Sequence, residues 1–117
     1  MATRLYLPVT PDDLAEALRT GSVRLPAETV AAPDESEDAE YEALLVAADV
    51  SAELVAGLPA GRRRRVVVVT ESREDPVRLR DVVAIHADDA DDADPDSDLG
   101  WYGTQELGDL VAGFTQA

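Results

Sequence analysis

His86 is the only histidine in a chain of 117 residues that contains no cysteine and no lysine. A mechanism that needs a nitrogen base near neutral pH must therefore use this imidazole. The missing cysteines exclude thiol nucleophiles, disulfides and thiolate metal sites, and the missing lysines exclude Schiff-base chemistry. No Gly-x-Ser-x-Gly motif accompanies the histidine, so a structural or exposed histidine near a strand end is the alternative to a catalytic one.

Three further polar residues follow the strands that we expect and could act together with His86. Asp12 comes after the first strand, Thr70 closes a later strand, and Asp88 follows His86 itself. If these strands are parallel, their carboxyl ends lie along one edge of the sheet, where open α/β sheets bind ligands. Such a cluster would suit a small hydrolase or a metal-assisted enzyme. In the alternative interpretation, Asp12 only favours the start of a helix and the loop acids are merely solvated.

Residues 88–98 hold seven aspartates in eleven positions and predict a solvated acidic loop rather than a helix or strand. If Asp94, Asp96 and Asp98 are aligned with the first ligands of an EF-hand loop, both the required glycine and the bidentate glutamate are missing. A high-affinity calcium loop is therefore not expected. Weak binding of divalent ions by these three carboxylates stays open beside a purely solubilising role.

Trp101 and Tyr102 are two of only five aromatic residues in the chain. Residues 100–103 superficially match the GXXG loop of RNA-binding domains, but no basic flank accompanies them, and we reject that interpretation. We expect the two aromatic side chains in the core or in an interface rather than in a ligand platform. They are the candidates for binding a partner.

The net charge of −15 restricts the possible partners. Basic side chains supply most of the non-specific affinity for phosphates, so we expect the chain to bind neither nucleic acids nor anionic membranes. A protein partner of cationic character suits this charge. The one cationic cluster, Arg62–Arg65, is expected to pair with the chain's own acids or with solvent rather than with phosphate. No motif implies a cofactor.

The longest uninterrupted apolar run, Ala43–Ala48, has six residues. This is too short for a membrane span, and the N-terminal segment is too short for a signal-peptide core. We therefore expect a cytoplasmic protein. The length favours a single domain over residues 1–117.

The first part of the chain predicts a strand, a helix and a second short strand. Residues 4–9 alternate with the period of a half-buried strand. Thr10 and Pro11 then favour the start of a helix, and Gly21 favours its end. Residues 29–32 predict the short strand.

The strongest periodic signal predicts one long helix from about Ser36 to Leu58. Its acidic start suits the positive end of a helix dipole, and Pro59 with Gly61 ends it. We expect one stripe of this helix to be buried against the sheet, formed by Tyr41, Leu44, Leu45, Ala48 and Val55.

The second half of the chain predicts two covered strands, Val66–Val69 and Val82–Ala87, because both runs are apolar without alternation. After the acidic loop, residues 99–102 predict a short strand and residues 104–114 a closing helix. Alternating strands and helices imply right-handed crossovers and partly parallel pairing. We therefore predict a small α/β domain with a mixed sheet of four or five strands and about three helices.

Five segments spread over nearly the whole chain carry a resemblance to a known family. They are the opening RLYLPVT, the helix approach EDAEYEALLVAA, the strand RRRVVVV, the run DVVAIHADD and the closing LGWYGTQELGDLV. In this combination the chain resembles a family of small uncharacterised acidic proteins of actinobacteria, classified as a domain of unknown function. The resemblance implies no activity, ligand or functional residue.

Two classes of function stay open on these observations. The one we favour is a non-enzymatic binding or regulatory module that docks a partner through its acidic face or its C-terminal aromatic segment. The alternative is the small hydrolase or metal-assisted enzyme around His86. The two classes differ in whether His86, Asp88, Thr70 and Asp12 converge in a concave pocket.

Overall fold

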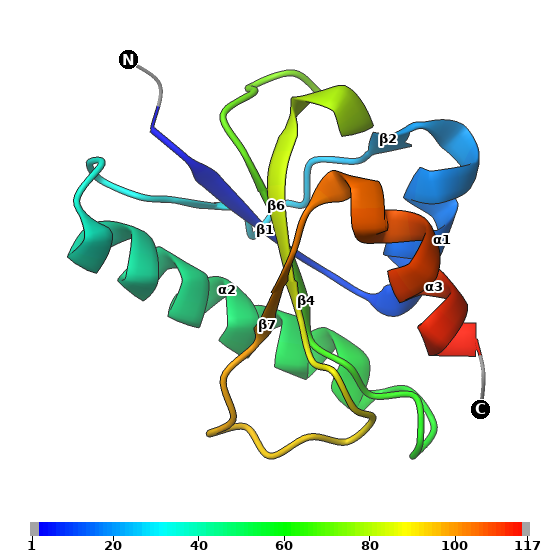
Figure 1. The fold of residues 1–117 in the computed structure, drawn as a ribbon. Coiled ribbons are helices and arrows are strands. Elements are labelled where there is room, and N and C mark those ends of the chain that lie inside the picture. The colour runs from blue at the N-terminus through cyan, green and yellow to red at the C-terminus, as the bar shows by residue number, and fades with distance from the viewer. Residues whose placement is uncertain (1–2, 116–117) are drawn as a thin grey trace.

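A computed structural model describes residues 3–115 as a central sheet with helices on both sides (Figure 1). Two single-turn 3-10 helices, Leu79–Asp81 and Thr104–Glu106, accompany the longer elements. Those elements are β1 (Leu5–Val9), α1 (Pro11–Thr20), β2 (Ser22–Val23), β3 (Val30–Ala31), α2 (Glu37–Ala56), β4 (Val66–Thr70), β5 (Val77–Arg78), β6 (Val82–Ala87), β7 (Gly100–Tyr102) and α3 (Leu107–Thr115).

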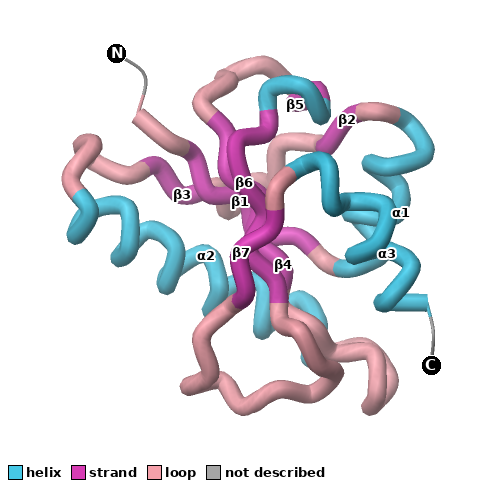
Figure 2. Tube along the Cα trace, in the orientation of Figure 1, coloured by secondary structure: helices cyan, strands magenta, loops and turns pink. Residues whose placement is uncertain are grey.

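The fold class that the sequence predicts is confirmed. Residues 3–115 form a five-stranded sheet in the order β3-β1-β4-β6-β7, a two-stranded sheet of β2 and β5, and three α-helices. Figure 2 shows the strands at the centre and the long acidic loop that joins β6 to β7. The predicted elements all occur, with ends that differ by a few residues.

The prediction of partly parallel pairing is wrong, because every strand pair in residues 3–115 is antiparallel. The reason lies in the connection from β1 to β4. Two helices separate these strands, and α2 returns the chain to the end of the sheet at which β1 finishes. Val66, at the start of β4, therefore pairs with Val9, at the end of β1.

The start of α1 follows the local chemistry that its sequence predicts. The Thr10 side chain accepts a hydrogen bond from the Asp13 amide at 3.1 Å, and the Asp13 carboxylate accepts one from the Thr10 amide at 3.0 Å. Pro11 occupies the first turn, and Gly21 ends the helix at a φ of 87°, which favours glycine. This helix is therefore specified by its own residues.

The central sheet has an apolar core on each face. On one face, side chains of β1, β4 and β6 pack with α1 and α3, and on the other face they pack with α2. All five residues of β1 are buried. The expectation of a half-buried β1 is thus wrong, because α2 covers the face that carries Tyr6.

The long helix α2 is confirmed, and its predicted buried stripe is right in part: Ala48 and Val55 are buried, and Leu44 is partly buried against the sheet. Tyr41 and Leu45 are exposed. Small side chains face the sheet in their place and let the helix backbone approach the β-branched surface of β4 closely. The buried residues of α2 are Ala39, Ala43, Ala47, Ala48, Ser51 and Val55.

Ser51 joins α2 to the two central strands. Its buried hydroxyl donates a hydrogen bond to the Val9 carbonyl at 2.7 Å and accepts one from the Val66 amide at 2.8 Å. These contacts fix the C-terminal part of α2 beside the end of β1 and the start of β4. None of the helices in residues 3–115 combines the length and the apolar character that crossing a membrane requires.

Candidate functional site

The antiparallel order separates Thr70 from the three other residues that could have formed a catalytic cluster with it. Thr70 pairs with Leu5 and Val82, at one end of the sheet. Asp12, in the first turn of α1, and Asp88, directly after β6, follow strands that finish at the opposite end. The expectation of one shared edge is therefore wrong for Thr70.

Thr70 has a complete set of structural partners. Its buried hydroxyl donates a hydrogen bond to the Asp81 carbonyl at 2.7 Å and accepts one from the Ser72 amide at 3.0 Å. Asp12 is exposed in the first turn of α1. There its charge favours the N-terminal end of the helix, in agreement with the structural interpretation of this residue.

Asp88 is buried, and it forms a bidentate ion pair with Arg65. The Asp88 carboxylate accepts hydrogen bonds from Nε of Arg65 at 3.0 Å and from Nη2 at 2.7 Å, and a third from the Arg65 amide at 2.8 Å. The side chains of Arg65 and Asp88 are only 8% and 2% exposed. These hydrogen bonds raise the pKa of Arg65 above its ordinary value, against the opposing effect of burial.

Arg65 also organises the rest of the acidic loop. Nη1 donates to the Pro95 carbonyl at 3.0 Å and Nη2 donates to the Ser97 carbonyl at 2.9 Å. The prediction of a loop is confirmed, but a solvated position is wrong for Asp88, because Arg65 needs a counter-charge inside the protein.

Two members of the arginine cluster pair with acids of the same loop. Nε of Arg64 lies 2.7 Å from a carboxylate oxygen of Asp91, and its guanidinium lies over the ring of Phe114. Together with the Arg65–Asp88 pair, this contact confirms that the chain's own acids are partners of the cluster.

Asp94, Asp96 and Asp98 lie at the exposed surface of the loop. The Asp94 carboxylate accepts a hydrogen bond from the Asp96 amide at 2.9 Å, which forms a local turn. In residues 3–115, no three histidine, aspartate or glutamate side chains are placed to hold one metal ion.

A groove of about 560 Å³ lies between α2 and β7 and is bordered by the acidic loop. Five strands spaced by about 4.8 Å span about 19 Å, whereas a helix is about 10 Å across with its side chains. α2 packs mainly on β1, β4 and β3, and it leaves this face open over β6 and β7. We call this cavity the α2–β7 groove; its lining is Tyr41, Leu44, Leu45, Ala48, Asp49, Arg65, His86, Pro95, Asp96, Ser97, Asp98, Leu99 and Trp101.

His86 lies in this groove, half-buried, directly opposite Trp101 in the ladder of β6 and β7. Burial lowers the pKa of the imidazole below its ordinary value of 6.5, and the positive charge of Arg4 lowers it further. No carboxylate in residues 3–115 forms a hydrogen bond with this ring. His86 therefore lacks the acidic partner that a catalytic dyad would supply.

The two candidate aromatic residues face opposite sides of the sheet. Trp101 lines the groove and is 63% exposed. Tyr102 packs against the core formed with α1 and α3. Only Trp101 is therefore available to a partner in the groove.

Sequence reasoning missed that Tyr41 and Leu45 belong to the same site. They form the wall of the groove on α2, although their periodicity assigned them to the core. The available signal was the width of the apolar stripe, since the buried side of α2 consists mainly of small residues together with Val55.

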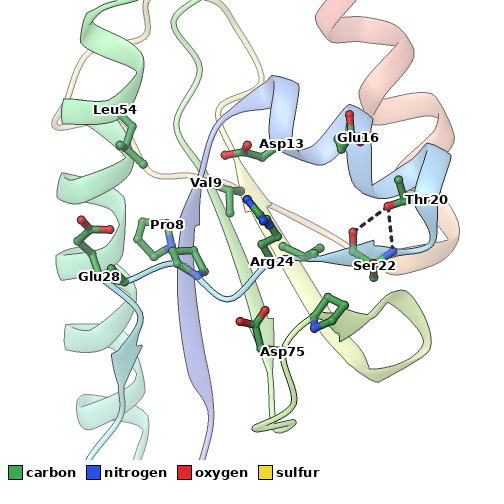
Figure 3. Close-up of a pocket in the computed structure, with 14 residues that line it drawn as sticks. Pro8, Val9, Asp13, Glu16, Thr20, Ser22, Arg24, Glu28, Leu54 and Asp75 are labelled. Atoms are coloured by element: carbon green, nitrogen blue, oxygen red, sulfur yellow. Dashed lines mark hydrogen bonds between the residues drawn. The ribbon is translucent and has the colours of Figure 1, made fainter.

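The structure holds a second, larger cavity of about 680 Å³ between β1, α1 and the segment that follows β2 (Figure 3). Arg24 projects into it, and the carboxylates of Asp13, Glu16, Glu28 and Asp75 lie around it. Asp75 accepts a hydrogen bond from the Leu25 amide at 3.0 Å. This cavity contains no aromatic residue and none of the candidates from the sequence.

Comparison with known proteins places the chain in a family. The model of a family of unknown function, DUF6912, matches residues 3–111. No curated protein and no solved structure matches the chain. With a match over nearly its full length, the chain belongs to the DUF6912 family of unknown function.

Proposed function

We propose that this protein is a non-enzymatic binding module and that its α2–β7 groove receives a cationic segment of a partner protein. The observation that carries the proposal is the gathering of exposed apolar side chains around an acidic groove. The groove also brings together the two features considered separately in the sequence, the acidic loop and Trp101.

The apolar part of the groove comes from two distant segments of the chain. Trp101, Tyr41 and Leu45 are 63%, 55% and 46% exposed, and all three line the same cavity. A contiguous apolar patch with a polar rim is typical of an interaction site, whereas single exposed apolar residues are ordinary. Tryptophan and tyrosine are also the residues that most often dominate binding energy at interfaces.

The charged part of the groove selects the sign of the partner. Asp49, Asp96 and Asp98 line the groove, and the one arginine in its lining, Arg65, is already paired with Asp88. The net charge of −15 extends the negative potential beyond the groove. Such a field attracts cationic segments and repels a second copy of the chain.

The enzyme alternative has less support from the same geometry. His86 shares the groove with three aspartates, but its imidazole has no carboxylate partner, and Thr70 lies at the other end of the sheet. A small hydrolase would need a nucleophile and a base within hydrogen-bond reach. We therefore favour binding over catalysis.

The proposal can be tested with the peptide acetyl-Val-Arg-Val-Arg-Val-amide, which alternates apolar and cationic side chains. Trp101 is the only tryptophan, so its fluorescence reports directly on the groove. We expect saturable binding that weakens as salt increases, and no binding of the counterpart with glutamate in place of arginine. Equal binding of the two peptides would contradict the proposal.

Charge-matched variants locate the binding surface. The double variant Asp96→Asn, Asp98→Asn should weaken binding about three- to tenfold, because exposed ion pairs contribute up to about 1 kcal/mol each. The control is Glu28→Gln, Glu53→Gln, which removes the same charge from exposed positions outside the groove. An equal loss in both double variants would show general attraction to an acidic protein rather than binding in the groove.

A further inference from the structure

We infer that the occupant of the α2–β7 groove is an extended segment that adds to β7 as a further strand and places an arginine side chain against Trp101. This inference rests on the proposed function and names the binding mode and the recognised side chain. It follows from the free edge of β7, from the direction of Trp101 and from the carboxylates beside it.

β7 is an edge strand of the five-stranded sheet. It pairs with β6 on one side and has no neighbour on the other among the strands of residues 3–115. In Figure 1, β7 runs in front of the other strands. Alternate residues of an edge strand direct their N–H and C=O groups away from the sheet, where an extended peptide can pair with them.

The two edges of the sheet differ in their suitability for such pairing. β3, at the far edge, has two residues and is followed closely by Pro33, which cannot donate a hydrogen bond to a new strand. No proline or lysine lies in β7, and it is flanked by Gly103. The edge that borders the groove is thus the one that accepts a strand.

The direction of Trp101 connects the edge with the groove. Side chains alternate across a strand, so Trp101 faces the groove while Tyr102 faces the opposite core. A residue of an added strand opposite Trp101 would lie on the same face, with its Cβ about 5 Å from that of the tryptophan. A long side chain at this position can lie across the indole, most of which is exposed.

Arginine suits this position better than any other side chain. Its planar guanidinium stacks on an indole ring and is attracted to the electrons of its face. Asp96 and Asp98 line the same groove and can accept the hydrogen bonds of the guanidinium at its edge. A lysine ammonium has neither the planar face nor the forked donors.

The same carboxylates oppose pairing between two copies of this chain. Two β7 strands placed edge to edge would bring two acidic loops together, each with seven aspartates in residues 88–98. Like charges on both sides disfavour that contact, as charged residues on edge strands do in other sheets. Because β7 has only three residues, few backbone hydrogen bonds are available, and the arginine must supply much of the selectivity.

N-methylated peptides test the added strand. In the extended peptide acetyl-Val-Arg-Val-Arg-Val-amide, the amides of both arginines point to one side and those of the valines at positions 3 and 5 to the other. Methylation of one set therefore blocks pairing with β7, and methylation of the other set is the matched control. We expect one methylated peptide to bind about tenfold more weakly and the other to stay within about threefold of the parent.

The outcomes separate the inference from the proposed function. If the parent binds and methylation changes both versions equally, the groove binds side chains only and the added strand is wrong. If the parent itself does not bind while the protein is folded, the proposed function is wrong as well. A strong loss in one methylated version alone supports the strand.

The arginine is tested separately, with the anisotropy of labelled peptides as the readout. Wild-type protein should bind the arginine peptide at least about threefold more tightly than its lysine counterpart. In Trp101→Leu this preference should disappear, because leucine offers no aromatic face. Tyr102→Leu is the control on the opposite face of β7 and should keep the preference. Equal binding of both peptides by the wild type would overturn the assignment of arginine.

Discussion

The two faces of the central sheet differ in how completely the chain covers them. On one face, α1, α3 and the small sheet of β2 and β5 pack over side chains from β1, β4 and β6. On the other face, the single helix α2 covers β3, β1 and β4 and leaves the α2–β7 groove over β6 and β7. One sheet thus has a closed face that provides stability and a partly open face that provides a surface.

This difference shows how one helix can serve both the core and a surface. The side of α2 that faces the sheet consists mainly of small residues, together with Val55. The larger apolar side chains, Tyr41 and Leu45, stand at the groove instead. A hydrophobic stripe on a helix can therefore mark the place of a missing neighbour rather than the core of the same chain.

The largest effect is expected where the acidic loop is attached to the sheet. Asp88→Ala leaves the Arg65 guanidinium buried without its counter-charge, and we expect it to reduce the free energy of unfolding by about 3 to 5 kcal/mol. Urea denaturation measures the change. Asp89→Ala removes an exposed neighbouring carboxylate and should alter stability by about 0.5 kcal/mol or less. Similar effects of the two substitutions would contradict the structural role of the Arg65–Asp88 pair.

The closed face should respond strongly to loss of volume. Ile85 is fully buried on β6 among residues of the closed face, so Ile85→Ala should cost about 2 to 5 kcal/mol and Ile85→Val about 0.5 to 1.5 kcal/mol. The two variants together show how the loss of stability depends on the side-chain volume removed from this face. Thermal or urea unfolding that showed no graded loss would mean that the face is not closed.

The open face should tolerate the same kind of truncation. Leu45 is 46% exposed, so Leu45→Ala should lower the free energy of unfolding by about 1 kcal/mol or less. Its effect should appear in the affinity for the arginine peptide instead. A stability loss as large as that of Ile85→Ala would show that α2 buries the stripe predicted from its periodicity.

The elements of this fold were predictable because their signals are local. The box formed by Thr10 and Asp13, the positive φ of Gly21 and the run of valines in β4 each depend on residues that are close in sequence. Pairing direction is different, since it depends on where α2 returns the chain, and no pattern within β1 or β4 encodes that.

The candidate site was predictable only in its parts. Trp101, His86 and the aspartates of the loop were singled out from the sequence, but their meeting in one groove depends on the antiparallel order of β6 and β7. The special position of Asp88 had no local signal among seven aspartates. Its partner Arg65 lies 23 residues away in the sequence. Only the tertiary structure therefore distinguishes Asp88 from the other six aspartates of the loop.

The smallest expected effect concerns the protonation of His86 in the open face. Its pKa is lowered in the folded protein, so the unfolded chain takes up this proton first as the pH falls through the ordinary value of about 6.5. The His86 contribution to stability is therefore complete above that value and is lost as the pH falls through the folded pKa. Relative to His86→Gln, the wild type should lose free energy of unfolding between about pH 7 and pH 5. Urea denaturation measures the free energy of unfolding of both proteins at each pH. Because both carry the same carboxylates, the difference between the two values reports on His86. A wild type that instead gained stability in acid would show that the groove aspartates stabilise the imidazolium. That result would support a pair between His86 and a carboxylate in the groove.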